Sequence, residues 1–536
     1  MLLDMLAAIF TPVHADEAYY ALYGQFLDWG YYDHPPMVAL LTFFSSLLCK
    51  GNLSIRFCTV FLHGLTVWLI WETLSSEKYD IQSVKRFFAI AFSMIMFSVY
   101  GVVTAPDAPL LFFTALFFFL YKKYLVKSAW TTALFMGLTL SGMLYSKYMA
   151  VLVVVFVMIS NWRVLKDPKI WMAGVLAIIL FLPHILWQLH HDFPSLAYHL
   201  IARNTSFSIR YPLEYLPNQL LVFNPACLVL ALYFCFKNRK SQDLFEKSCI
   251  YSVVGFVFFF WIMTFKGHAE PHWTVAASIP MIVLLFNQLK GSYWQLWMRW
   301  GVIPVAVLLL LGRLVLPIVI SDKAGLFISQ SKTMEAIHQY CGDTPVVFPS
   351  SFQESSLYRF YTQKDAVSLS SLYGRQTQFD LLQLDKALQG KPATVVSPIL
   401  EQLNVQNTQN VYVGDGIQLF CKKYDHFQGA NRLRIEVDKY HISGDTLTLD
   451  LLVENPYDVP FYFNHPEFVN TLHVAYKFDQ YFTITCSIPD NIVIPSGGYV
   501  RFSTQTDYFP NVPFVICVDN QICRSVNSRP MVISKL

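Results

Sequence analysis

Apolar runs alternate with short polar segments over the first three-fifths of the chain. After a short run at 1–13, the runs lie near residues 57–76, 87–103, 109–121, 130–145, 149–160, 170–187, 219–236, 250–265, 274–288 and 300–320. A membrane-spanning helix needs about 20 mostly apolar residues. The pattern therefore predicts a polytopic α-helical membrane protein with about 11 transmembrane helices. Several runs are shorter than a full span and must extend into flanking polar residues or stay half-buried; the run at 1–13 predicts an abbreviated first helix or a longer native chain.

The pattern changes after about residue 320. Residues 321–425 mix helical and strand signals, with strands predicted at 346–348 and 410–413 and a helix starting near 376–380. Residues 426–536 alternate apolar and polar positions at 433–437, 447–453 and 499–502, between turn clusters at 443–445 and 496–498. Short alternating strands at this spacing are typical of a β-sandwich. The predicted domains are a membrane module over 1–320, a small α/β domain over 321–425 and a β-sandwich-like domain over 426–536.

The composition agrees with a membrane class. Of 536 residues, 54% are hydrophobic and only 14% are charged, whereas soluble domains carry about 25% charged residues. The net charge of +3 comes without a basic tract, which argues against a nucleic-acid partner.

The loops differ in charge when the runs alternate across the membrane. One side holds 15 basic residues and the other holds 6: Lys78, Lys85, Arg86, Lys122, Lys123, Lys127, Arg163, Lys166, Lys169, Lys237, Arg239, Lys240, Lys247, Lys290 and Arg299 against Lys50, Arg56, Lys147, Arg203, Arg210 and Lys266. The positive-inside rule makes the first set cytoplasmic. This alternation requires that the short run at 37–49 does not cross. It places the loop at 14–56 and the C-terminal region on the outer face, which in a bacterial plasma (inner) membrane is periplasmic.

Acidic residues gather on this predicted outer face. Asp16 and Glu17 precede two tyrosines, Asp33 and His34 precede Pro35-Pro36, and Asp107 lies between two prolines. Carboxylates at a membrane face are costly to desolvate, so they favour a functional role. The structural alternatives are a helix N-cap for Asp16 or Asp107 and a turn residue for Asp33.

Histidines and cations occupy the later outer loops. His268 and His272 lie in the segment 266–273, and a second histidine group lies within 184–199. Such groups raise a metal-binding hypothesis, against which stands a simple interfacial placement of polar aromatic residues. Lys147, Arg203 and Lys266 either bind an anionic headgroup or extend to the interface.

These residue types together indicate one chemistry. An outer carboxylate can act as general base toward an acceptor hydroxyl or amine, cations can hold a phosphate leaving group, and aromatic apolar surface can accommodate a polyprenyl chain. The sequence has no GxGxxG or Walker motif that would indicate a nucleotide site. The pattern favours glycosyl transfer from a lipid-phosphate sugar.

At these residues the chain resembles the GT-C membrane glycosyltransferases, in the group that includes protein O-mannosyltransferases and the aminoarabinose lipid A transferases. The resemblance covers about residues 14–320. Its main motifs are Asp16-Glu17-Ala18-Tyr19-Tyr20, Tyr31-Tyr32-Asp33-His34-Pro35-Pro36 and Pro106-Asp107-Ala108-Pro109, with weaker matches at 142–148 and 183–187.

The resemblance implies inverting transfer of a sugar from a polyprenyl-phosphate donor to an acceptor at the outer face. It implies catalytic roles for Asp16, Glu17 and Asp107. The residue types themselves favour lipid-phosphate contacts from His34, Lys147, Arg203 and Lys266. Some relatives bind a divalent ion, for which the matching residues are Asp33 with His268 or His272. The aminoarabinose transferases have Glu-Lys before Pro-Pro where this chain has Asp33-His34, so the lysine at that position is missing.

Two other functions are compatible with the pattern. One is a transporter or flippase of lipid-linked sugars, although the matched broken repeats typical of transporters are not visible. The other is a membrane-anchored binding module in which the β-rich region acts. That region carries no catalytic constellation, and recognition of the acceptor and a purely structural role are both open for it.

Overall fold

The computed structural model describes residues 1–74, 80–202, 207–290, 295–319, 330–349, 351–397, 408–413 and 417–534. Its internal contacts divide the chain into two compact units, Met1–Phe327 and Ile328–Leu536. The finer division into three domains with boundaries near 320 and 425 stays a prediction.

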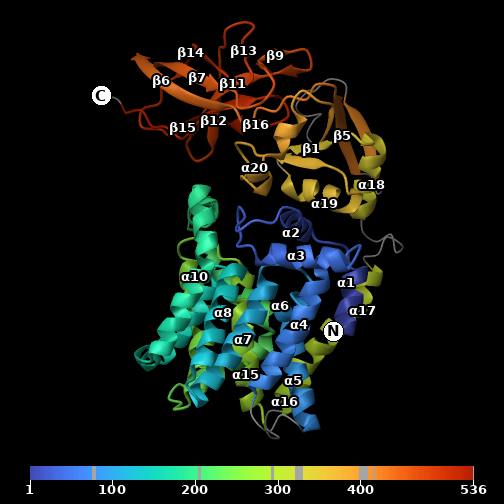
Figure 1. The fold of residues 1–536 in the computed structure, drawn as a ribbon, viewed down its shortest axis with the longest axis vertical. Coiled ribbons are helices and arrows are strands. Elements are labelled where there is room, and N and C mark those ends of the chain that lie inside the picture. Colours follow the sequence, from blue (N-terminus) through green and yellow to red (C-terminus); the bar gives the residue numbers. More distant parts are fainter. Residues whose placement is uncertain are drawn as a thin grey trace. The chain divides into compact units, whose positions relative to one another are not determined.

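The first unit is helical (Figure 1). Its helices are α1 Leu2–Phe10, α2 Ala15–Gln25, α3 Met37–Leu48, α4 Leu53–Thr73, α5 Ile81–Ser93, α6 Ile95–Val99, α7 Asp107–Val126, α8 Trp130–Ser146, α9 Ala150–Ser160, α10 Pro168–His190, α11 Pro194–Ala197, α12 Arg210–Phe223, α13 Pro225–Lys237, α14 Leu244–Met263, α15 Ser278–Gln288, α16 Gln295–Trp297 and α17 Ile303–Val319.

Five helical stretches among the described residues are long and apolar enough to cross a membrane: α4, α7, α10, α14 and Gln295–Val315. The pair α12 and α13 makes a sixth candidate if it counts as one span, bent by 103°. Asn224 causes that bend, because its positive φ of 76° and the following proline interrupt the helix, and its side chain then caps α13 at the Ala226 N–H. A helical membrane protein is confirmed, and the count of about 11 spans stays a prediction.

The apolar surface of α10 faces outward rather than into the protein. Only 22% of the most apolar stretch of this helix is buried inside the protein. Its large exposed side chains include Trp171, Val175, Ile178, Ile179, Leu182, Ile185, Leu186 and Leu189. A continuous exposed apolar surface of this kind marks an interaction surface, and on a helix of 23 residues the hydrocarbon of a bilayer is the fitting partner.

Helix α3 has only 12 residues, about 18 Å at 1.5 Å per residue, against a hydrocarbon core of about 30 Å. It lies across one end of the bundle that contains α4, α7 and α8 (Figure 1). This geometry agrees with the prediction that residues 37–49 do not cross.

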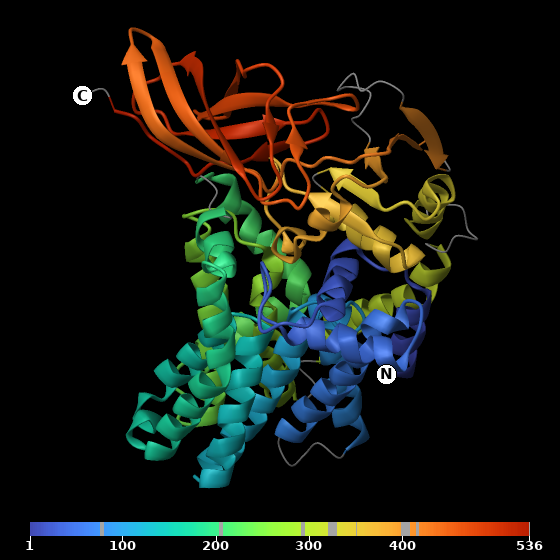
Figure 2. The same ribbon diagram turned by 45° about the horizontal axis from the view of Figure 1, so that its top comes forward.

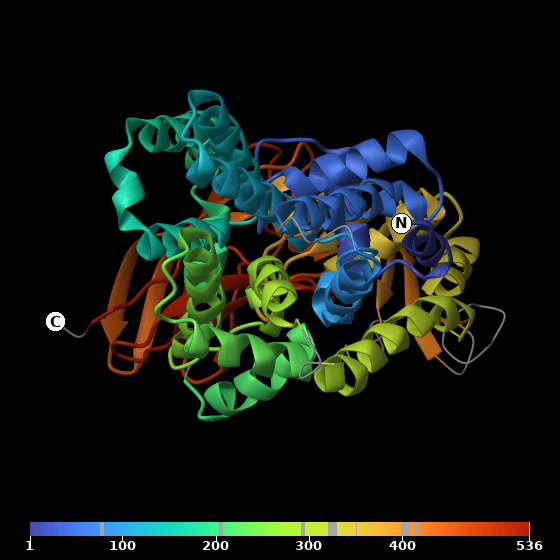
Figure 3. The same ribbon diagram turned by 90° about the horizontal axis from the view of Figure 1, so that it is seen from below.

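Contacts at the other end of the bundle join loops that the charge count assigned to one side. Lys122 Nζ donates to the Thr73 carbonyl at 2.6 Å, and Arg86 donates to the Leu289 carbonyl at 3.2 Å. Gln288 and Asn238 both donate to Glu246. Figure 3 looks at this unit from the end where α16 lies. The lysine-rich loops therefore cluster together, as alternating spans require.

The second unit begins with a mixed sheet in the order β2-β1-β3-β5-β4, flanked by helices. Its elements are α18 Gln330–Cys341, β1 Val346–Pro349, α19 Phe352–Thr362, β2 Ala366–Leu369, α20 Gln378–Leu382, β3 Ala393–Ser397, β4 Gln409–Val413 and β5 Ile417–Tyr424. Strand β1 runs parallel to β2 and β3, and β5 runs antiparallel to β3 and β4. The predicted strands at 346–348 and 410–413 are confirmed.

Antiparallel strands fill the rest of this unit. They are β6 Arg434–Ser443, β7 Thr446–Glu454, β8 Phe461–Tyr462, β9 Asn464–His465, β10 Phe468–Val469, β11 Thr471–Lys477, β12 Tyr481–Cys486, β13 Val493–Ile494, β14 Tyr499–Asp507, β15 Phe514–Asp519 and β16 Arg524–Val526. The sheets β14-β7-β6 and β12-β11-β15-β16 share one hydrophobic core, and Figure 2 shows the long strands β6 and β7 side by side in orange. Gly444 forms the β6–β7 turn with a positive φ of 59°, which glycine adopts at no steric cost.

Candidate functional site

The first turn of α2 presents two adjacent carboxylates. His14 precedes the helix and caps it, because its Nδ1 accepts the Asp16 N–H at 3.2 Å. The His14 N–H in turn donates to Glu17 Oε2 at 3.0 Å. The Asp16 side chain remains 49% exposed, whereas that of Glu17 is 1% exposed. The two neighbouring acids therefore have opposite surroundings.

Glu17 forms a buried ion pair with Arg56 of α4. Arg56 Nε donates to Glu17 Oε1 at 2.7 Å, and its terminal nitrogen donates to Oε2. The Thr104 N–H also donates to Oε1, at 2.9 Å. Arg56 donates further to the carbonyls of Ala8, Thr11 and Pro12. This fork-to-fork pair joins α2, α4 and the loop before α7, because a bidentate guanidinium–carboxylate contact fixes both groups.

Tyrosines of α2 hold the loop that carries Asp33. Tyr23 donates its hydroxyl to the buried Asp33 carboxylate. The Tyr31 ring stacks on Tyr23 with centroids 4.2 Å apart. Helix α2 meets α3 closely at Gly24, where a Cβ would lie 2.5 Å from Thr42 Oγ1, and Thr42 donates to the Tyr20 carbonyl at 3.0 Å. The aromatic residues of the first motif thus position the second motif.

Asp107, the first residue of α7, pairs with Lys147 at the end of α8. The lysine Nζ lies 2.8 Å from both carboxylate oxygens, and both side chains are buried. The predicted second acid and one predicted phosphate-binding cation are therefore direct partners.

His34 and Tyr20 lie where these groups converge. The Tyr20 hydroxyl and His34 Nε2 are 3.4 Å apart. Burial raises the pKa of Tyr20 well above its usual value, and the charges of Asp33, Asp16 and Asp107 add to that rise. Burial lowers the pKa of His34 to about 3, against an opposing effect of Asp33. Asp107 and Lys147 also act on His34, so Asp16, Asp33, Asp107 and Lys147 all lie around this pair. We call Asp16, Tyr20, Asp33, His34, Asp107 and Lys147 the acid cluster.

His184 and His199, from the second histidine group, complete the surroundings of the acid cluster. His199 Nε2 donates to the Asp33 carbonyl at 2.9 Å. His184 Nδ1 donates to the Trp29 carbonyl at 2.7 Å, so its Nε2 accepts the Tyr148 hydroxyl at 2.9 Å. Tyr148 belongs to the weak motif at 142–148 and His184 to the one at 183–187. These two motifs were the signal in the sequence that pointed to this pair.

The other predicted site residues make other contacts or cannot be placed. Lys266 is exposed after the end of α14. His268 lies 3.7 Å from the Glu270 carboxylate, and the His272 ring packs against Tyr100 with centroids 6.3 Å apart. Arg203 lies outside the described residues.

The predicted metal ligands have other neighbours in this structure. Within the described ranges there is no group of three or more His, Cys, Asp or Glu side chains that could hold an ion. Asp33 instead accepts from Tyr23, and His268 lies beside Glu270. A metal site at Asp33 with His268 or His272 therefore stays a prediction.

Part of the chain matches a known family and a known relative. The family model described as Dolichyl-phosphate-mannose-protein mannosyltransferase matches residues 33–187. The lipid A galacturonosyltransferase RgtD of Rhizobium johnstonii (strain DSM 114642 / LMG 32736 / 3841) is 24% identical over 307 residues, which cover 54% of this chain and 62% of that protein. The chain thus spans slightly less than two thirds of that relative.

Two solved structures share the fold. The structure of ArnT from Cupriavidus metallidurans bound to undecaprenyl phosphate matches with a TM-score of 0.59 and 13% identity, over 78% of this chain and 96% of that one. The apo structure of the same protein gives a TM-score of 0.58 and 12% identity over the same shares. The resemblance suggested by the acidic motifs is confirmed: this chain is similar to the membrane glycosyltransferases of the GT-C group.

Proposed function

We propose that this chain transfers a sugar from a polyprenyl-phosphate donor to an acceptor, with inversion, at the outer face of a bacterial plasma membrane. The acid cluster is the single observation that carries the proposal. It combines a half-exposed carboxylate, a buried acid–lysine pair and a tyrosine at one end of a helical membrane unit. The similar ArnT structure contains undecaprenyl phosphate, which supports a lipid-linked donor.

Asp16 is the proposed general base. Among the acids of the acid cluster, Asp33 accepts from Tyr23 and Asp107 from Lys147, and both are buried. The half-exposed Asp16 is accessible to an acceptor. Its carboxylate takes the proton of the acceptor hydroxyl or amine as that atom attacks the anomeric carbon. A general base typically contributes 10²- to 10⁴-fold to the rate.

Lys147 is the proposed contact for the leaving group. The new bond to the anomeric carbon forms as the bond from that carbon to the phosphate oxygen breaks, and polyprenyl phosphate leaves with the bonding electron pair. A lysine ammonium stabilises the developing phosphate charge. Asp107 holds Lys147 in place before the donor arrives, because it contacts Nζ with both oxygens. Lys147 and Asp107 both lie close enough to His34 to shift its pKa. In this proposal His34 makes the second contact with the phosphate.

Glu17 has a positioning role in this proposal. Arg56 occupies both of its oxygens inside the protein, so it is unsuited to accept a proton from an acceptor. The catalytic role implied by the resemblance therefore narrows to Asp16 and the Asp107–Lys147 pair. The orientation with the acid cluster outside, about 11 spans and the three-domain division all belong to the same proposal.

A transfer assay tests the proposal against the transporter alternative. Purified protein in proteoliposomes receives a radiolabelled polyprenyl-phosphate sugar and a lipid A acceptor. The proposal expects labelled acceptor in the presence of wild-type protein. Donor translocation across the bilayer with no labelled product would favour the flippase.

A further inference from the structure

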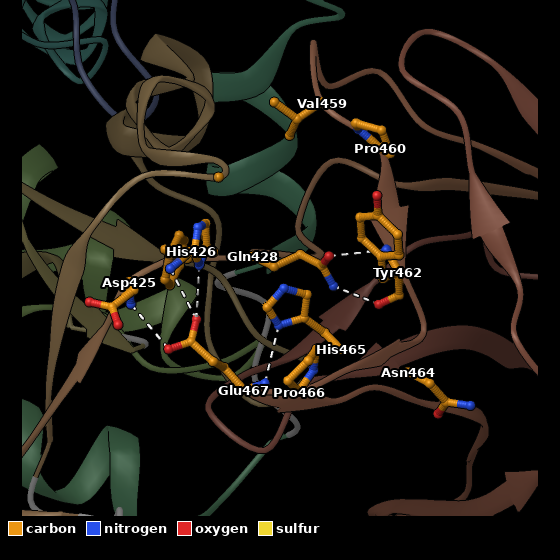
Figure 4. A pocket seen from close by; sticks show the side chains of 12 residues that line it. Asp425, His426, Gln428, Val459, Pro460, Tyr462, Asn464, His465, Pro466 and Glu467 are labelled. Carbon is orange, nitrogen blue, oxygen red and sulfur yellow. Dashed lines mark hydrogen bonds and ion pairs between the residues drawn. The ribbon is translucent and has the colours of Figure 1, made fainter.

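The second unit contains a cavity of about 690 Å³ that lies outside the membrane unit's acid cluster. One wall is the segment 425–428 that follows β5, and the other is the segment 459–467 that carries β8 and β9 (Figure 4). Ligand sites typically have volumes of about 300–1,000 Å³. The cavity is thus large enough for a sugar unit or a short saccharide.

Hydrogen bonds tie the two walls together. The Glu467 carboxylate accepts the N–H groups of Asp425 and His426, at 3.1 and 3.0 Å. The buried Gln428 amide donates to the Tyr462 carbonyl at 2.7 Å and accepts the Tyr462 N–H at 3.0 Å. These reciprocal bonds leave the walls little freedom, so the cavity is preformed, which lowers the entropic cost of binding.

The lining combines an aromatic face with several polar tips. The Tyr462 side chain is 39% exposed, and its ring lies 6.0 Å from that of His465. Asn464 is exposed on the same wall as Tyr462, and Asp425 and His426 are exposed on the other wall (Figure 4). An aromatic ring offers apolar area with a polar handle. A carboxylate, an amide and imidazoles offer both donors and acceptors at several angles. Saccharides need this combination, because they present a C–H face and a ring of hydroxyls.

The charge of the lining narrows the class of saccharide. Asp425 and Glu467 contribute two carboxylates. Burial lowers the pKa of His465, so its imidazole is neutral at pH 7. The imidazole of the other histidine, His426, lies 3.9 Å from the Glu467 carboxylate, which would balance a positive charge on it. The site is therefore unfavourable for uronic acids or phosphorylated sugars.

We propose that this cavity binds a hexose-containing saccharide without acidic groups, through stacking on Tyr462 and hydrogen bonds to Asn464 and Asp425. This makes the second unit a glycan-binding module in its own right. The inference does not require the membrane unit to be a transferase.

Saturation-transfer NMR on the full chain tests this site. The protein is held in nanodiscs or in lauryldimethylamine oxide, because detergents with sugar headgroups would compete. The probes are mannobiose, cellobiose, galactobiose and di-N-acetylchitobiose, with digalacturonate as the acidic comparison. At least one neutral probe is expected to bind, and digalacturonate at least 10-fold more weakly. Binding of none of the four, or tighter binding of digalacturonate, overturns the proposal.

Variants locate the binding in the cavity. Tyr462→Ala and Asn464→Ala are each expected to weaken it at least 10-fold. Tyr440→Ala, which removes a 50% exposed tyrosine of β6 outside the cavity, is the matched control and should bind as wild type. Wild-type binding by both cavity variants contradicts the site. Asp16→Asn should keep full saccharide binding, so a failure of the proposed transferase activity remains distinguishable from a failure of this site.

Discussion

Lys147 Nζ lies 2.8 Å from both carboxylate oxygens of Asp107, and the pair is buried at the junction of α7 and α8. Each group neutralises the other where an isolated charge would be costly. A donor phosphate entering the acid cluster would share the lysine with Asp107. The pair is thus both a structural element and the proposed phosphate contact.

Removing the lysine alone should be more harmful than removing both partners. Lys147→Met leaves Asp107 buried without its counter-charge, which costs about 3–5 kcal/mol of stability. Lys147→Met with Asp107→Asn removes that penalty. Thermal unfolding of the purified variants should therefore place the double variant between Lys147→Met and wild type. Transfer activity should be lost in both, and additive destabilisation would contradict this account of the pair.

The Glu17–Arg56 pair should be required for folding rather than for the chemical step. Glu17→Gln removes one charge of a fully buried bidentate pair, and about 3–5 kcal/mol of stability should be lost. The measurements are the unfolding midpoint and the activity per folded molecule at low temperature. A stable but inactive Glu17→Gln protein would instead restore Glu17 to the catalytic residues.

His34 should make stability depend on pH. Burial lowers its pKa from 6.5 to about 3 in the folded protein, so between those values the unfolded chain binds the proton and the folded chain does not. Stability contributed by neutral His34 is complete above pH 6.5 and falls as the pH decreases toward 3, by up to about 1.4 kcal/mol per pH unit. His34→Gln should flatten the decrease in unfolding midpoint between pH 7 and pH 4.5. Parallel curves for the two proteins would contradict the buried neutral imidazole.

Gly24 should tolerate no side chain. A Cβ there would lie 2.5 Å from Thr42 Oγ1 and 2.9 Å from the Phe43 nitrogen, so Gly24→Ala must separate α2 from α3. Overpacking of this kind costs about 1–3 kcal/mol. Gly174→Ala is the matched control, because a Cβ at Gly174 meets nothing within 4 Å. Equal unfolding midpoints for the two variants would show that the α2–α3 contact is loose.

The sequence predicted what depends on local pattern. Apolar runs predicted α4, α7, α10 and α14, and period-2 alternation predicted β6, β7 and β14. The short run at 37–49 forms the helix α3, whose 12 residues are fewer than the roughly 20 that a membrane-spanning helix needs. Two contacts agree with the grouping of the loops by charge, since Lys122 donates to the Thr73 carbonyl and Arg86 to the Leu289 carbonyl.

The partners of the acidic residues could not be predicted. Glu17 and Arg56 are 39 residues apart, and Asp107 and Lys147 are 40 apart. Such pairs depend on how helices pack rather than on any spacing in the sequence. For the same reason, the hydrogen bond from Tyr23 to Asp33 could not be predicted from the sequence. The resemblance supplied the positions of the acids, and the packing decides which of them remains accessible.

The most direct test of the central claim is the transfer rate of Asp16→Asn with a polyprenyl-phosphate sugar. Asparagine keeps the size of the half-exposed side chain and removes its basicity, so folding and donor binding should be unchanged. The rate of transfer at saturating donor should fall at least 100-fold. The matched control Asp28→Asn changes an acid outside the acid cluster that accepts from Trp187, and it should retain transfer. Wild-type transfer by a folded Asp16→Asn protein would contradict the account.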